Sequence, residues 1–237
     1  MEKIGKELRV LHSAALLSPP SGTVAQMDWE QDAAKALGIN WKVRMYCPLN
    51  IINNANIFQF DNEIDSKKLI TPLSKLRAWI KLRKNYHSWL LRQQEDIDIF
   101  VLRYYVHDPY QLNFLLRCKK PVYFIHHTLE VPELALEGVF TGLIRSKLDS
   151  ILGRITISKS MGVIGVTDEI VRYELKRADV PGLRSFVYPN GIFLEHRPMV
   201  DVRSVNVPEL LLASLVLGKK LPLVKNPLAG LPYVGGA

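Results

Sequence analysis

Two consecutive histidines, His126 and His127, stand at the end of an apolar run that begins after Pro121. Such a run predicts a buried strand, and ligands of open α/β sheets bind at the carboxyl ends of strands. Because successive strand side chains point to opposite faces, we expect at most one of the two imidazoles to face a cleft. The alternative is that both histidines are partly buried and make only local hydrogen bonds.

A turn-rich loop over Leu17–Gly22 precedes a predicted helix over Thr23–Leu37, which stops at the natural C-cap Gly38. Backbone N–H groups at a helix N-terminus suit phosphate, so Ser21, Gly22 and Thr23 are candidate binding residues. The loop has neither a GxGxxG pattern nor a P-loop lysine–threonine pair. An ordinary turn is the alternative.

Acidic residues open another predicted helix at Thr167–Asp168–Glu169. They favour the positive end of the helix, which is a sufficient structural explanation, but the position after a strand is also where a substrate would be met. His107 and Asp108, taken with the two histidines, suggest a metal site. Their spacing matches no standard metal pattern, and we expect no metal. No GxSxG nucleophile motif is present.

The segment Pro72–Gln94 predicts a long amphipathic helix in which basic and apolar residues are interleaved. One interpretation is an ordinary surface helix with a solvated basic side. Another is an interfacial helix that meets anionic lipid. No recognised nucleic-acid motif accompanies the charge, so nucleic acid is not an expected partner. The candidate membrane-surface residues are Lys75, Arg77, Trp79, Lys81, Arg83 and Lys84.

Strand and helix signals alternate along most of the chain, which predicts a Rossmann-like parallel sheet with helices on both faces. The sheet should have six or seven strands, with the His127 and Ser21–Gly22 loops at its carboxyl edge. We expect an irregular stretch over Pro48–Asp65. The predicted strands are Leu8–His12, Asn40–Tyr46, Ile97–Arg103, Pro121–His126, Met161–Val166 and Phe186–Tyr188; the further helices are Asp108–Cys118, Pro132–Ser158 and Thr167–Ala178.

The composition is that of a globular protein: 237 residues, 48% hydrophobic and 23% charged, with a net charge of +8. A basic chain is drawn to nucleic acid, anionic lipid or phosphorylated substrates. The two cysteines, Cys47 and Cys118, form no CxxC pattern, which excludes a disulfide framework and suits a reducing cytosol. No apolar run approaches the ~20 residues that span a bilayer, and the N-terminus is a poor secretory signal.

Five segments in order resemble the N-terminal domain of GT-B glycosyltransferases of family 4, over residues 8–192. They read SGTVAQMDWEQDAAKALGINW, DIDIFVLRYYVHDPY, PVYFIHHTLEVPEL, GVIGVTDEIVRYELKRADVPG and VYPNGI. The resemblance implies a retaining transfer from a nucleotide-sugar donor, without a cofactor or metal. The first loop, with Ser21–Gly22 where many members have a first glycine, would approach the donor phosphate. His127 would be the catalytic histidine; the further substrate-binding residues would be Thr23, His126, Asp168 and Asn190.

The resemblance also implies a domain plan. Residues 1–192 form one Rossmann-like domain that mainly holds a carbohydrate or lipid-linked acceptor, and residues 193–237 are a linker remnant and irregular tail. We expect a truncated transferase, without its donor domain and inactive alone, that works in polysaccharide, glycolipid or cell-envelope synthesis at the cytoplasmic membrane face. The alternatives are a non-catalytic binding or scaffold module that pairs with a separate donor-domain protein, and an unrelated Rossmann-type nucleotide binder.

Overall fold

The computed structural model describes residues 8–49, 56–136 and 141–188. The chain divides into two compact units, Met1–Arg197 and Pro198–Ala237, and the description below concerns the first. The predicted domain boundary between residues 192 and 193 lies outside the described residues.

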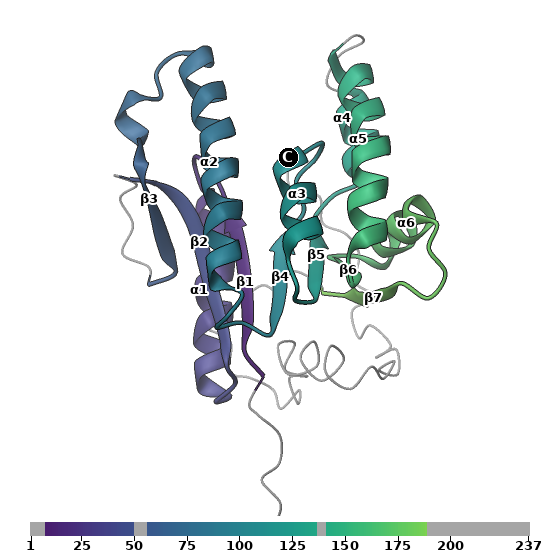
Figure 1. Cartoon of the computed structure of the whole chain (residues 1–237), viewed down its shortest axis with the longest axis horizontal. Helices are drawn as coiled ribbons and strands as arrows, with labels where there is room; N and C mark the ends of the chain where they lie inside the picture. The colour runs from purple at the N-terminus through teal and green to yellow at the C-terminus, as the bar shows by residue number, and fades with distance from the viewer. Residues whose placement is uncertain (1–7, 50–55, 137–140, 189–237) are drawn as a thin grey trace, which may run out of the picture. The chain divides into compact units, whose positions relative to one another are not determined.

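A seven-stranded, wholly parallel sheet organises this unit, with the order β3-β2-β1-β4-β5-β6-β7 (Figure 1). Every neighbouring pair is parallel. The order runs outward in both directions from β1, as in doubly wound Rossmann-like sheets, and confirms the predicted fold class. The strands are β1 Val10–Ala15, β2 Trp41–Leu49, β3 Phe58–Asp65, β4 Ile99–Arg103, β5 Val122–His126, β6 Gly162–Gly165 and β7 Arg184–Val187.

The prediction of an irregular segment over Pro48–Asp65 is wrong in part, because the structure has strand β3 within it. Its sequence, FQFDNEID, is polar, and within it only Asp61 and Ile64 are buried. As the edge strand next to β2, β3 needs few apolar residues, so the usual strand signal is weak.

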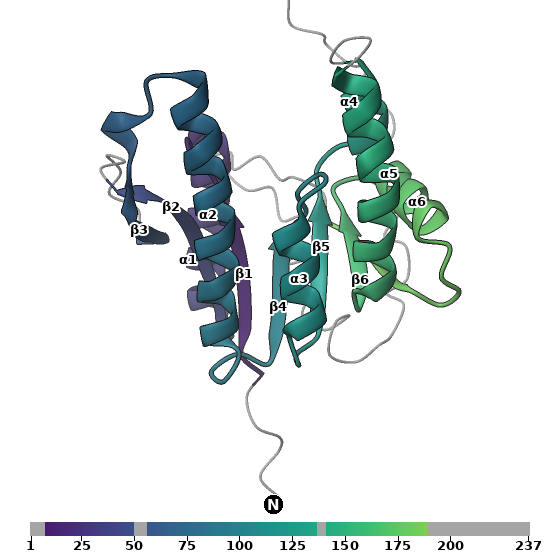
Figure 2. The same ribbon diagram turned by 45° about the horizontal axis from the view of Figure 1, so that its top comes forward.

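Helices cover both faces of the sheet, as the alternation of β1 side chains shows. Leu11 belongs to a core cluster with Leu82 of α2 and Ile157 of α5, whereas the next side chain, His12, contacts Glu30 of α1. Helix α1 therefore lies on the face opposite to α2 and α5 (Figure 2). The helices are α1 Ser21–Ala36, α2 Pro72–Gln93, α3 Pro109–Arg117, α4 Glu130–Leu136, α5 Thr141–Lys159 and α6 Asp168–Ala178, with a short 3-10 turn at Ser66–Lys68.

Side-chain caps fix where several helices begin. Thr71 and Ser74 form a reciprocal capping box at the start of α2. Asp108 accepts hydrogen bonds from two backbone amides of α3, and Thr167 accepts one from α6. Since each cap follows a strand or its loop, the caps determine how the chain leaves the carboxyl edge of the sheet.

Candidate functional site

The ends of three adjacent strands form the candidate site. β1 ends at Ala15, β4 at Arg103 and β5 at His126, and because all three are parallel neighbours, their following loops meet at one edge. The Ala15 amide donates to the Tyr105 hydroxyl, in the loop after β4. This bond ties the first two loops together. The structure thus places the Ser21–Gly22 and His127 loops at the same edge of the sheet, as predicted.

Helix α1 presents an open N-terminus at this edge. It begins at Ser21, and Pro20, in the N-cap position, makes no side-chain capping bond. The first amides of a helix have no intrahelical acceptor, and a helix N-terminus favours anions. A Cβ added at Gly22 would meet nothing within 4 Å, so packing does not demand glycine there. Ser21 and Gly22 are exposed and Thr23 is half-buried.

His127 is half-buried just after β5. Burial, assisted by the nearby charge of Arg103 and opposed by Glu130, lowers the pKa of His127 to about 4. The imidazole is therefore neutral at pH 7. A neutral imidazole can donate one hydrogen bond and accept another, so it suits a sugar hydroxyl better than it suits general acid catalysis. Its predicted catalytic role stays a prediction.

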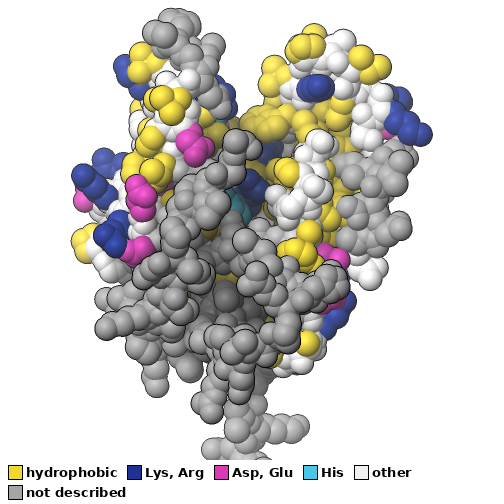
Figure 3. All heavy atoms as spheres, turned by 180° about the vertical axis from the view of Figure 1, so that it is seen from behind, with side chains coloured by type: hydrophobic (Ala, Val, Ile, Leu, Met, Phe, Trp, Pro, Cys, Tyr) yellow, Lys and Arg dark blue, Asp and Glu magenta, His cyan; other side chains and the backbone are white. Residues whose placement is uncertain are grey.

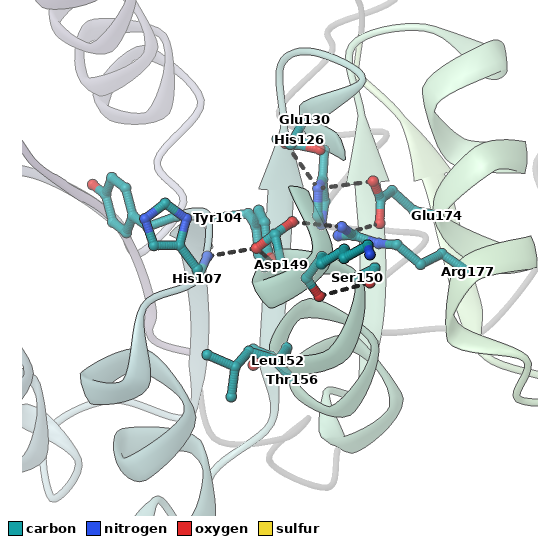
Figure 4. Close-up of polar contacts among 12 residues, drawn as sticks. Tyr104, His107, His126, Glu130, Asp149, Ser150, Leu152, Thr156, Glu174 and Arg177 are labelled. Carbon is teal, nitrogen blue, oxygen red and sulfur yellow. Dashed lines mark hydrogen bonds and ion pairs between the residues drawn. The ribbon is translucent and has the colours of Figure 1, made fainter. Parts of the chain in front are cut away.

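His126 occupies the opposite face and is fully buried. Its ring stacks on Tyr104, with centroids 4.4 Å apart. Its Nδ1 lies 3.1 Å from Glu130 Oε1 and 3.6 Å from Glu174 Oε1 (Figure 4). We predicted that His126 binds substrate directly; its complete burial places it behind the strand end in this structure, and the role stays a prediction.

A buried ionic network continues from His126 into the helices. Arg177 of α6 lies 2.6 Å from Glu174 and 2.7 Å from Asp149 of α5. Asp149 also accepts from the Tyr104 hydroxyl at 2.8 Å and from the His107 backbone amide (Figure 4). The network therefore joins α5 and α6 to the strand ends of β4 and β5.

The pKa values of the two glutamates of the network shift in opposite directions. Burial raises the pKa of Glu174 to about 7, although His126 and Arg177 oppose the shift. Burial also acts to raise the pKa of Glu130, but His126 outweighs it by charge and hydrogen bond, so that this pKa is lowered. The buried network therefore favours the ionised form of Glu130 more strongly than that of Glu174.

The same cluster is the one metal-like group among the residues that the structure describes. Ligand atoms of His126, Glu130 and Glu174 lie within 4.8 Å of one another. A carboxylate–imidazole set of this kind suits a divalent cation, and we expected no metal. Arg177, ion-paired with Glu174, already supplies positive charge where a cation would, so the residues fit an ion-pair network better than a metal centre.

The sequence did not single out the charged members of this network outside β5. Glu174 and Arg177 are three residues apart on α6, on a helix whose buried face includes Ile170 and Val171. Charged residues inside an apolar face are unusual. Charged residues within the apolar face of this helix were therefore the feature of the sequence that could have indicated a buried ionic network.

The other substrate-binding predictions fare differently. Asp168 is exposed in the first turn of α6 and is ion-paired with Arg172, so its helix position and local pair explain it. Asn190 lies outside the described residues. Neither finding tests a role in substrate binding.

The candidate membrane-surface residues of α2 are exposed with two exceptions. Trp79 is half-buried, and Arg83 is only 4% exposed. The Arg83 guanidinium lies 3.2 Å over the Tyr105 ring, and its Nε is 3.7 Å from Asp108 Oδ2. It is not available to a flat membrane surface. No helix in the described part of the chain is both long and apolar enough to cross a membrane.

Comparisons with known proteins give distant structural likeness alone. No protein-family model matches the chain, and no curated protein matches it. Among solved structures, Phytolacca americana UGT2 complexed with UDP-2-fluoro-glucose and pterostilbene has 10% identity and a TM-score of 0.46; the match covers 81% of this chain and 56% of that one.

Two further structures are similar to the same extent. A sucrose-phosphate synthase from Thermosynechococcus elongatus has 12% identity and a TM-score of 0.47, over 87% of this chain and 99% of that one. A Polygonum tinctorium UDP-glucosyltransferase capable of glucosylating indoxyl has 9% identity and a TM-score of 0.46, over 81% and 55%. This chain thus spans about half the length of the two plant enzymes. Likeness this distant assigns no activity to it.

Proposed function

We propose that this chain provides the acceptor-side domain of a retaining, nucleotide-sugar-dependent glycosyltransferase of the GT-B type. The observation that carries the proposal is that an open helix N-terminus, at Ser21–Gly22, and the neutral His127 lie at the same edge of the sheet. A sugar attached to a diphosphate needs both kinds of group: amides for the anion and a hydrogen-bonding side chain for the hydroxyls.

The charges at this edge favour an anionic donor. Arg103 ends β4 and lies close enough to His127 to lower its pKa. When the glycosyl bond breaks, negative charge develops on the leaving diphosphate, and prearranged donors and cations stabilise it. Helix α1 and Arg103 would contribute on this side of the cleft, and His127 would hold the sugar.

The proposal extends to the acceptor and the place of action. The exposed cations of α2 would hold the domain against anionic lipid at the cytoplasmic membrane face, where carbohydrate or lipid-linked acceptors for envelope or glycolipid synthesis are found. The groups that hold the nucleotide would come from a second domain or a separate donor-domain protein.

Nucleotide-sugar binding by Gly22 variants tests this site. A methyl group at Gly22 enters open space, so Gly22→Ala should leave the urea midpoint unchanged or slightly raised. If phosphate approaches the α1 N-terminus, the same methyl group should weaken UDP-glucose binding by about tenfold, a value typical of one lost charge-assisted hydrogen bond. Isothermal titration calorimetry compares wild type with Gly22→Ala, with the chain alone and mixed with a donor-domain protein.

The control and the refuting result are clear-cut. Glu169→Ala changes an exposed residue in the first turn of α6 and should not alter the affinity. Equal affinity of wild type and Gly22→Ala, or no binding of any of a panel of nucleotide sugars under either condition, would contradict the proposal.

A further inference from the structure

A cavity of about 310 Å³ lies beside the candidate site, between two helices that flank the carboxyl edge. Helix α2 lines it with Leu76, Trp79 and Arg83, which share one helix face at spacings of three and four residues. The loop after β4 contributes Tyr105–His107, and α5 contributes Arg145. Neither the sheet-edge predictions nor the proposed donor site uses this cavity.

Arg83 supplies a buried cation to the cavity wall. Two of its nitrogens, Nε and Nη1, have no hydrogen-bond acceptor among the described residues. Its ion pair with Asp108 is long, at 3.7 Å, and the Tyr105 ring covers one guanidinium face. Buried donors without acceptors are costly, and a guanidinium is well matched to phosphate oxygens. The side chain therefore points to an anionic ligand.

The surrounding charges are also positive. Arg145 is a second cation in the lining. Helix α2 holds six lysines and arginines and no acidic residue. The one acidic residue of α5, Asp149, is buried and paired with Arg177. Two copies of this basic surface would repel each other. An anionic ligand is therefore favoured in the cavity over contact with a second copy of the chain.

Apolar side chains extend from the cavity along both helices. Leu76 is more than half exposed although it lines the cavity, and Leu73 and Ile80 are exposed one turn away on α2. Leu148, one turn from Arg145 on α5, is exposed as well. In the view from behind, hydrophobic side chains lie on both sides of a hollow, with basic and, on one side, also acidic side chains among them (Figure 3). Exposed apolar surface of this kind marks a ligand or membrane contact.

We propose that this cavity binds the phosphate of a membrane lipid, with Arg83 and Arg145 on the phosphate and the lipid chain along Leu76 and Trp79. A cation pair beside apolar side chains matches an amphiphile whose charge and chain are adjacent, which inorganic phosphate and uncharged lipid are not. Binding of the lipid phosphate does not depend on the proposed function. Only the further step, in which this lipid accepts the sugar, rests on that function.

Short-chain phosphatidic acid, soluble without vesicles, is the probe that separates this pocket from general membrane adsorption. Calorimetry on the full chain should show binding of dihexanoyl phosphatidic acid and far weaker binding of inorganic phosphate and dihexanoylglycerol. Arg145→Gln and Leu76→Gln should each reduce the affinity for phosphatidic acid, by about tenfold for the arginine.

Matched controls exist for both variants. Arg92→Gln removes a cation from the other end of α2, and Leu116→Gln changes an exposed leucine of α3; neither residue lines the cavity. Both should bind like wild type. None of the four substitutions changes Arg83, because its loss would leave Asp108 buried without its ion-pair partner.

Three results would overturn the inference: no binding of phosphatidic acid, equal binding of inorganic phosphate, or losses no larger than those of the control variants. These assays involve no nucleotide sugar. If phosphatidic acid binds as expected while Gly22→Ala leaves UDP-glucose binding unchanged, the lipid pocket stands and the proposed transferase function fails.

Discussion

Asp149→Asn should destabilise the protein strongly, because Asp149 holds together three parts of the carboxyl edge. Its carboxylate is fully buried, lies 2.7 Å from Arg177 and accepts from Tyr104 and the His107 amide. Removing one partner of a buried ion pair costs about 3–5 kcal/mol. With a urea m-value of roughly 2 kcal/mol/M, the midpoint should fall by about 2 M, as measured by circular dichroism.

The double variant Asp149→Asn/Arg177→Met isolates the ion pair. Arg177→Met alone leaves Asp149 and Glu174 without their cation, so it should be costly. The double variant should cost less than the sum of the two, with a coupling of about 1–3 kcal/mol. The exposed pair Arg154–Asp179 is the control, and Asp179→Asn should barely move the midpoint. Additive effects, or a loss below about 1 kcal/mol for Asp149→Asn, would refute this account of the network.

Three further predictions concern stability and lipid. Burial, followed by the charge of Arg83, lowers the pKa of His87 to about 3. On acidification the unfolded state therefore binds a proton at this histidine before the folded state does. The free energy of unfolding should fall as the pH drops from about 6.5 toward 3, by at most about 1.4 kcal/mol per pH unit. His87→Gln should flatten this slope in urea titrations, and an unchanged slope would count against it. Gly162→Ala would place Cβ 2.5 Å from the Arg184 carbonyl oxygen, and chemical denaturation should show a loss of about 1–3 kcal/mol; a neutral result would mean that β7 moves freely. Changing exposed Lys75, Arg77 and Lys84 to serine should reduce co-sedimentation with anionic vesicles, by about 1 kcal/mol per cation at low salt, with no binding to neutral vesicles before or after; undiminished binding would exclude α2 as the contact.

The sequence predicts the fold well where apolar patterning is strong. The buried strands β1, β4, β5 and β6 fall within a few residues of the predicted ranges, because continuous apolar runs are typical of parallel strands. Helix α2 matches its prediction almost to the residue, since Pro72 opens it and a capping box fixes its start. Edge strand β3 was missed because it buries little.

The site is less predictable because its contacts are long-range. Arg83 stands among exposed cations of α2, and nothing local indicates that Tyr105 and Asp108, more than twenty residues later, enclose it. His126 and His127 could not be assigned to faces without knowing which helices cover β5. Alternation correctly allowed only one of them to face outward, and the structure identifies it as His127.

Sugar transfer that depends on His127 is the most direct test of the proposed function. The chain, alone and with a donor-domain protein, would be given labelled nucleotide sugars and membrane lipid acceptors, and proton NMR would determine the anomeric configuration of the product. The account predicts transfer with retention when donor-binding groups are supplied. It also predicts a loss of about a hundredfold in His127→Ala, with the folded state intact by circular dichroism. Inverted product, or transfer at full rate in His127→Ala, would contradict it.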